Sequence, residues 1–368
     1  MKITDIQVTK HAIPLDPPFC PSWDTRPRTS FTAFITRVET DAGIVGTASG
    51  DDMLGLEQFK ELFIGRDPLD LERHYQILSN MAFHYSRYWP LDLALWDIAG
   101  KVSGLPVWRM LGGKSGTVAL YASSGTLREP GALAAQAQRF LAEGFAAMKV
   151  RFHRGDWRED IKALETIRKK IGGGLELMVD CNQGWRMVWD IEEPWKLKDA
   201  LPVARELERL GVYWMEEPLF RGDVKGMKAL RELTGLRIAA GEMNRELFEF
   251  RNLVEERAVD VLQPDAALAG GITGLRRVAL MCREADVMFT PHTWSNGVGM
   301  VANAHLVAAL SNAPFMEFPY DPPEWSVERR DFMMARKYPA KKGALDLGHE
   351  PGLGIAYDEA LLAKTRVA

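Results

Sequence analysis

Ionisable residues follow a series of short apolar segments in the second part of the chain. Seven successive segments end in such groups, which are Lys149 with Arg151, then Asp180, Glu216, Glu242, Asp265, His292 and Glu317. Counted from Lys149, successive groups lie roughly 31, 36, 26, 23, 27 and 25 residues apart, about the length of one strand and one helix with their connections. A single carboxylate in such a place is usually a helix cap or a surface charge. Seven repeats of the same position indicate instead that these side chains share one site.

Three of these carboxylates are candidate metal ligands. Asp180, Glu216 and Glu242 end neighbouring segments, and carboxylates so placed would repel one another unless a cation lay between them. Hard oxygen ligands suit Mg²⁺, and Mn²⁺ is also compatible. Zinc fits less well, because no cysteine and only one well-placed histidine are available. The spacing therefore predicts one divalent metal ion.

Asp265 and His292 are a candidate acid–base pair. They end consecutive segments, so a hydrogen bond from the imidazole to the carboxylate would orient the ring and favour its protonated form. His153 shares a strand face with residues 149 and 151 and is expected at the mouth of the same pocket. The other histidines are expected to be packing or surface residues.

Eight apolar segments alternate with amphipathic stretches after about residue 115, and we expect each to be a strand. Parallel strands need such crossovers, and eight of them over about 200 residues favour a closed barrel, in which the carboxyl ends of the strands meet on one face. The expected strands are 118–122, 146–152, 175–180, 212–216, 237–241, 259–264, 287–291 and 315–318.

The first 115 residues have a different pattern. Strand-like segments at 3–13 and 32–39 flank a loop at 14–28 that is rich in proline and aromatic residues, and helical periodicity follows at 69–81 and 91–102. The repeat of strand and helix stops near residue 322. We therefore predict an α+β capping domain at 1–115, a barrel at 116–322, and a segment at 323–368 that packs on the cap.

Composition excludes several classes of protein. Of 368 residues, 46% are hydrophobic and 26% charged, and the net charge is −4, so there is no basic field for nucleic acid or an anionic membrane. No stretch of about 18 apolar residues could span a bilayer, and residues 1–6 resemble a strand rather than a signal peptide. Three scattered cysteines are too few for a disulfide framework. We expect a cytoplasmic protein and a homo-oligomer, between a dimer and an octamer.

Several short motifs resemble the mandelate racemase subgroup of the enolase superfamily. They are Ala94–Lys101 with Gly104-Leu105-Pro106, Asp180–Trp185, Glu216-Glu217-Pro218 and Gly241-Glu242. The resemblance implies a modified TIM barrel, (β/α)7β, beneath an N-terminal α+β cap that the C-terminal tail completes. It implies that Asp180, Glu216 and Glu242 bind Mg²⁺.

The resemblance also implies the chemistry. The metal would bind a substrate carboxylate, a base would remove the α-proton, and the metal would stabilise the resulting enediolate. Asp265 and His292 match the catalytic dyad of the subgroup, and Glu317 matches its acid near the substrate carboxylate. Members of the subgroup then either reprotonate the carbon or expel a β-hydroxyl.

One departure from the family pattern favours dehydration. The second strand often carries Lys-x-Lys, whose second lysine is a base, whereas this chain has Lys149-Val150-Arg151. Arginine stays protonated, so Arg151 would hold a carboxylate or enolate oxygen, and racemisation would need Lys149 as the second base. A dehydratase can work with His292 alone. We therefore predict a Mg²⁺-dependent dehydratase that converts an aldonate or aldarate to a 2-keto-3-deoxy acid.

By resemblance, residues 14–28 and 50–56 would close over the pocket. They offer a polar set suited to a polyhydroxylated acid: Trp23, Asp24, Arg26, Arg28, Asp51 and Asp52. Among these and the barrel residues, the predicted substrate contacts are Trp23, Arg26, Asn182 and His153.

Other functions remain open. A racemase, an epimerase or a cycloisomerase would use the same enolate chemistry. A sugar-acid binding protein would need no base, so an intact dyad argues against it. Residues 297–302 fit a dinucleotide fingerprint, but they follow His292 in the seventh unit, and close helix packing explains their glycines better than an NAD-dependent oxidoreductase does.

Overall fold

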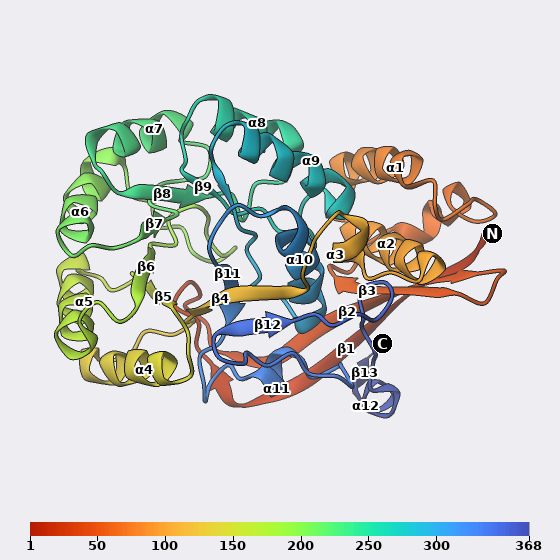
Figure 1. Cartoon of the computed structure of the whole chain (residues 1–368), viewed down its shortest axis with the longest axis horizontal. Coiled ribbons are helices and arrows are strands. Elements are labelled where there is room, and N and C mark those ends of the chain that lie inside the picture. Colours follow the sequence, from red (N-terminus) through yellow and green to blue (C-terminus); the bar gives the residue numbers. More distant parts are fainter. Residues whose placement is uncertain (368) are drawn as a thin grey trace.

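A curled parallel sheet forms the centre of the larger part of the molecule (Figure 1). The computed structural model describes residues 1–367, so Ala368 of the predicted C-terminal segment lies outside the described part. The parallel strands are β4 (Thr117–Ser123), β5 (Ala147–Arg151), β6 (Glu176–Asp180), β7 (Trp214–Glu216), β8 (Arg237–Ala240), β9 (Val261–Leu262), β10 (Met288–Phe289) and β11 (Met316–Pro319). Neighbours follow chain order from β4 to β10, and β11 pairs with β4. The predicted (β/α)7β class of fold is confirmed.

The strand ring is not a continuous ladder. In the described residues, β10 and β11 share no backbone pairing, and side chains join them instead. Thr290 Oγ1 donates to Phe315 O at 2.8 Å, and Ser311 Oγ donates to Phe289 O at 2.6 Å. β9 and β10 contain two residues each, shorter than the predicted segments, because Pro264 and Pro291 have no N–H to extend a ladder.

Seven helices surround the sheet (Figure 1). They are α4 (Pro130–Ala142), α5 (Trp157–Ile171), α6 (Leu197–Arg209), α7 (Val224–Leu233), α8 (Leu247–Glu255), α9 (Gly271–Glu284) and α10 (Gly297–Leu310). α5 illustrates how local sequence stabilises the ends of these helices. Asp156 caps its first turn by accepting from Arg158 N, and its last turn is basic, which favours the helix dipole. α10 is buried on nearly every side because it packs between the barrel and the cap.

The cap is an antiparallel sheet with helices on one side. It contains β1 (Ile3–Phe19), β2 (Arg28–Thr40), β3 (Val45–Gly50), two short 3₁₀ turns, η1 (Leu56–Gln58) and η2 (Lys60–Leu62), and the helices α1 (Leu71–His84), α2 (Trp89–Ser103) and α3 (Val107–Met110). The predicted loop at 14–28 was too long. β1 continues through its prolines to Phe19, because the β13 side of this strand is paired only at Lys10 and His11, and prolines are tolerated at an unpaired edge.

The C-terminal segment contacts both parts of the molecule. It contains α11 (Val327–Arg330), β12 (Ala344–Asp346), α12 (Glu359–Thr365) and β13 (Arg366–Val367). β13 extends the cap sheet by pairing with β1, whereas β12 pairs antiparallel with the barrel strand β4. The segment was expected to pack on the cap, and its pairing with the barrel strand β4 is an addition to that prediction.

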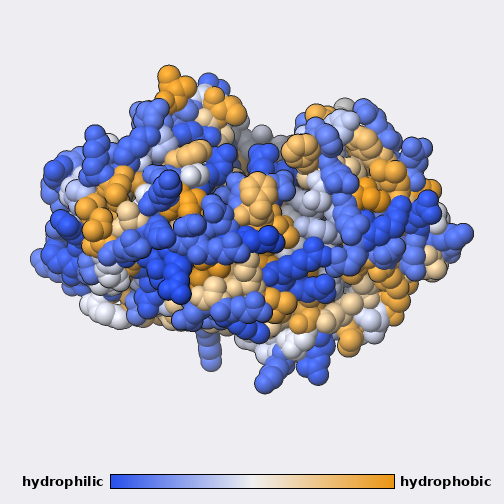
Figure 2. All heavy atoms as spheres, turned by 90° about the horizontal axis from the view of Figure 1, so that it is seen from above, coloured by the Kyte–Doolittle hydropathy of each residue, from blue (hydrophilic) through white to orange (hydrophobic). Residues whose placement is uncertain are grey.

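The face of the molecule seen in Figure 2 is mostly hydrophilic. Figure 2 shows one face on which apolar side chains form small, scattered groups among polar ones. Within residues 1–367, no helix is both long and apolar enough to cross a membrane.

Candidate active site

The predicted site residues lie at one end of the barrel. Arg151, Asp180 and Glu216 are the last residues of β5, β6 and β7, and the strand register places Arg151 opposite Asp180 and Asp180 opposite Glu216. Glu242, Asp265 and His292 follow the next three strands within a few residues, and Glu317 lies in β11. All of these side chains are buried. The parallel sheet therefore brings them together at the carboxyl ends of its strands.

Asp180, Glu216 and Glu242 form a compact group of oxygen ligands. One carboxylate oxygen from each lies within 4.8 Å of the others. Hydrogen bonds orient the three groups: Asn182 N donates to Asp180 at 2.9 Å, Gln263 Nε2 to Glu216 at 2.8 Å, and Trp185 Nε1 to Glu242 at 2.7 Å. Three hard, orientated oxygens of this kind fit Mg²⁺ or Mn²⁺.

The charges around this group also fit a divalent cation. Burial raises the pKa of Glu216 to about 8, and burial also raises the pKa of Glu242. The buried carboxyl groups here outnumber the two buried cations, Lys149 and Arg151. These carboxyl groups belong to Asp180, Glu216, Glu217, Glu242, Asp265 and Glu317. A divalent ion would supply the positive charge that holds the carboxylates in their ionised form.

Lys149 and Arg151 are ion-paired beneath the cavity. Lys149 Nζ lies 2.7 Å from Glu317 Oε1 and 3.5 Å from Asp180 Oδ2, and it also contacts Glu216. Burial lowers the pKa of Lys149, but the surrounding carboxylates outweigh burial and hold that pKa above its usual value. Arg151 pairs with Asp180 and donates from Nε to Ser124 O at 2.7 Å. Both side chains are therefore held as cations.

Asp265 and His292 form a hydrogen-bonded pair. His292 Nδ1 lies 3.0 Å from Asp265 Oδ2, while the other Asp265 oxygen accepts from Asn303 Nδ2 at 2.8 Å and Ala267 N at 2.9 Å. Asp265 is thus an acceptor on both sides, which fixes a ring proton on Nδ1. Nε2, which lies 3.8 Å from Glu242 Oε2, is therefore the nitrogen that can exchange a proton with a ligand. Burial lowers the pKa of His292, but Glu242 and the bond to Asp265 outweigh it and raise that pKa to about 9.

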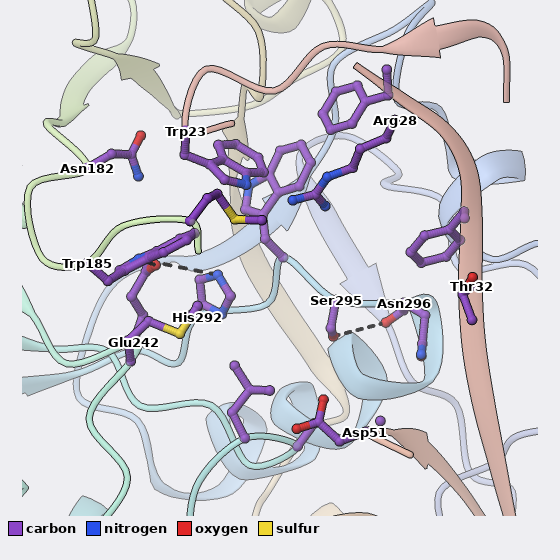
Figure 3. Close-up of a pocket in the computed structure, with 18 of the residues that line it drawn as sticks. Trp23, Arg28, Thr32, Asp51, Asn182, Trp185, Glu242, His292, Ser295 and Asn296 are labelled. Carbon is purple, nitrogen blue, oxygen red and sulfur yellow. Dashed lines mark hydrogen bonds and ion pairs between the residues drawn. The ribbon is translucent and has the colours of Figure 1, made fainter. Parts of the chain in front are cut away.

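A cavity of about 500 Å³ lies above these groups, between the barrel and the cap. Its barrel side includes Arg151, Asn182, Glu242 and His292, and its cap side includes Trp23, Arg28 and Asp51. Figure 3 shows His292 and Glu242 side by side beneath Trp185, with Asp51 and Arg28 on different walls. Aromatic rings form much of the wall, which excludes water from the reacting groups.

Comparisons with known proteins identify the family. Residues 132–361 match the model described as enolase C-terminal domain-like, and residues 3–112 match the N-terminal domain of mandelate racemase/muconate lactonizing enzyme. The chain belongs to this family of the enolase superfamily. The resemblance inferred from the sequence motifs is therefore confirmed.

Relatives of this protein catalyse different reactions. This chain is 32% identical to the 3,6-anhydro-alpha-L-galactonate cycloisomerase of Streptomyces coelicolor over 228 residues, which span 62% of this chain and 59% of the cycloisomerase. It is 29% identical to the L-Ala-D/L-Glu epimerase of Bacillus subtilis, covering 86% and 88%. L-talarate dehydratase from Polaromonas sp. JS666, solved with Mg and L-glucarate, has a TM-score of 0.85 at 25% identity, covering 100% and 98%. The family membership thus indicates an enzyme and leaves open whether it is a lyase or an isomerase.

Two of the substrate contacts predicted from the sequence, Arg26 and His153, are not part of the cavity lining. Arg26 is exposed and stacks on Trp189, with its guanidinium 4.2 Å from the ring centroid. His153 follows the end of β5 at Arg151, where the chain leaves the strand and the alternation of faces no longer applies. Trp23 and Asn182, by contrast, line the cavity.

Other residues of the site were not singled out by the spacing of charges. Gln263 bonds Glu216, Ser123 Oγ donates to Glu317 at 2.8 Å, and Arg87, Trp294 and Trp325 line the cavity. Gln263 and Trp294 carried a usable signal, because each lies two residues from a predicted site residue at the end of a strand. Trp325 had none, because it comes from the C-terminal segment.

Proposed function

We propose that this protein is a Mg²⁺-dependent acid-sugar dehydratase, which converts an aldonate or aldarate to a 2-keto-3-deoxy acid. The observation that carries the proposal concerns the three ionisable side chains on the barrel side of the cavity, Arg151, Glu242 and His292. Glu242 is a candidate metal ligand and Arg151 is a fixed cation paired with Asp180, which leaves His292 as the group that can act as a base. A single base supports elimination, in which one group can both take and return a proton.

The proposed reaction uses the residues in defined roles. A bound Mg²⁺ would supply positive charge beside the substrate carboxylate and so favour loss of the α-proton. Glu242 is the largest cause of the raised pKa of His292, and a cation bound at Glu242 would offset its charge and so favour the neutral ring. His292 Nε2 then takes the α-proton, and Asp265 holds the ring and stabilises its charge. Arg151 holds a substrate oxygen. His292 then protonates the leaving β-hydroxyl: the α C–H and β C–O bonds break, a C=C bond forms, water departs, and the enol product tautomerises to the 2-keto-3-deoxy acid.

Lys149 is better suited to positioning than to proton transfer. Its ammonium group contacts Asp180, Glu216 and Glu317, and the raised pKa described above makes it a weak proton acceptor at neutral pH. Racemisation, which needs a second base, is therefore less well supported. Glu317 is itself fixed by Ser123 and by Thr293 N, which donates to it at 2.7 Å, so it would orient Lys149.

One observation favours a second candidate, a cycloisomerase of a lactone or anhydro-sugar acid. Phe19, Trp23, Trp294 and Trp325 line the cavity, and their faces suit the C–H groups of a ring. This reaction would use the same metal site and the same base.

A screen of acid sugars with Mg²⁺ tests the proposal. We expect 2-keto-3-deoxy products, and we expect His292→Asn to abolish their formation while the variant still binds Mg²⁺. Proton NMR in D₂O separates the alternatives: exchange or epimerisation without dehydration would contradict the lyase, and ring opening or isomerisation without loss of water would favour the cycloisomerase. Retained activity in His292→Asn would refute its role as the base.

A further inference from the structure

Three arginines line the cavity, and they differ in which nitrogens of the guanidinium are already paired. Arg151 is held by Asp180 and by Ser124 O. Arg87 faces Asp51, with Nη1 3.4 Å from Oδ2. Arg28, at the start of β2, is anchored through Nε alone, 3.4 Å from Asp24 Oδ2.

Asp24 is a weak competitor for the rest of the Arg28 guanidinium. Its other oxygen accepts from Arg26 N at 2.9 Å and from Trp189 Nε1 at 3.1 Å. These bonds fix the carboxylate against the barrel loop that carries Trp189. Within residues 1–367, the two terminal nitrogens of Arg28 have no hydrogen-bond or ion-pair partner. Figure 3 shows the guanidinium directed into the cavity, on the far side from Glu242.

The wall around Arg28 supplies no other counter-charge. It is built from packed aromatic rings, with centroids 5.0 Å apart for Trp23 and Trp294, 5.0 Å for Phe19 and Trp325, and 5.1 Å for Phe31 and Trp325. The side chain of Arg28 is 38% exposed, so a ligand in the cavity can reach its guanidinium. The rings on its other side screen a charge less than water does, so the unpaired guanidinium edge favours an anion.

We propose that Arg28 binds a second carboxylate, so that the substrate is an aldarate-type diacid rather than an aldonate. This inference rests on the proposed function, which assigns the first carboxylate to the metal side of the cavity. The two terminal N–H groups of an arginine match the two oxygens of a carboxylate. Because Arg28 belongs to the cap and the metal carboxylates belong to the barrel, a diacid would bridge the two.

Affinities for matched acids test the inference. Each diacid and the monoacid of the same chain length and configuration, for example galactarate with galactonate and glucarate with gluconate, are titrated calorimetrically into the Mg²⁺-loaded His292→Asn protein, which prevents turnover. We expect at least one diacid to bind about 10- to 100-fold more tightly than its monoacid, the range for a hydrogen-bonded charge. Arg28→Gln should remove this preference, and Arg28→Lys should retain part of it.

Arg26→Gln is the matched control, because it removes an arginine of the same loop that does not line the cavity, and it should leave the preference unchanged. Equal affinity for the two acids, no diacid binding, or a preference that survives in Arg28→Gln overturns the inference. Product analysis with the unmodified enzyme separates the inference about Arg28 from the proposed function. If a monoacid is dehydrated and Arg28→Gln has no effect, the inference about Arg28 fails and the proposed dehydratase remains supported. If a diacid binds tightly through Arg28 but yields no 2-keto-3-deoxy acid, only the proposed dehydration is contradicted.

Discussion

His305 makes the stability of the protein dependent on pH in a predictable direction. It lies in α10, where Nδ1 accepts from Trp108 N at 3.0 Å and Nε2 donates to Leu353 O at 3.2 Å. These bonds tie the barrel to α3 and to the C-terminal segment, and they require the neutral ring. Burial lowers the pKa of His305 from 6.5 to about 4.

The direction in which stability changes with pH follows from proton uptake by His305. As the pH falls below 6.5, the unfolded chain binds a proton at this histidine before the folded protein does, so the stabilisation is complete above 6.5 and is lost toward pH 4. The difference in pKa corresponds to about 3.4 kcal/mol in full, of which about 1.8 kcal/mol is lost between pH 7 and pH 5.

Urea unfolding at pH 7 and pH 5 measures this loss. Other buried groups titrate in the same range, because burial raises the pKa values of Asp92 and Asp160 to about 6, so the effect is isolated by comparison with His305→Gln. We expect the unmodified protein to lose about 1.8 kcal/mol more than this variant. His84→Gln, at an exposed histidine, is the control and should behave like the unmodified protein. Parallel losses in the unmodified protein and His305→Gln would refute the reasoning.

Three further predictions concern the site and the cap. Lys149→Met should destabilise the metal-free protein by about 3–5 kcal/mol, because buried carboxylates lose their partner; an unchanged melting temperature would contradict this. Mg²⁺ at a hundredfold its Kd should stabilise the protein by about 2.7 kcal/mol, and Glu216→Gln should remove most of that gain in the same thermal assay. Gly352→Ala should cost more stability than Gly43→Ala, because both have positive φ but only the first would place a Cβ 2.1 Å from an oxygen of Asp97; equal costs would argue against the clash.

The sequence predicted the barrel well because its signal is local. Each predicted barrel strand contains or overlaps an observed one, since an apolar segment ending in an ionisable group marks both a strand and its carboxyl end. The charged members of the candidate site, from Lys149 to Glu317, followed from the same repeat. The glycines of 297–302 proved to be packing positions: a Cβ on Gly297 would lie 2.1 Å from an oxygen of Asp331.

What the sequence could not predict depends on distant contacts. The aromatic wall combines Phe19 and Phe31 of the cap with Trp294 of the barrel and Trp325 of the tail, and no spacing rule links these positions. Arg26 was chosen over Arg28 as a contact because both lie in one polar loop, and only the fold shows which side chain faces inward. The extension of β1 past Pro14 likewise depends on how far β13 reaches along it.

The double pairing of the C-terminal segment has a consequence for biosynthesis. The strands β1 and β4 are synthesised early, whereas their partners β13 and β12 are synthesised near the end of the described chain, after Trp325. During translation one edge of β1 and one edge of β4 therefore stay unpaired, and unpaired strand edges are prone to aggregation. The wall above the reacting groups is completed only when synthesis has passed Trp325. A nascent chain that stops earlier has neither a closed cavity nor a partner on these edges of β1 and β4, so the edges stay open to pairing with other chains.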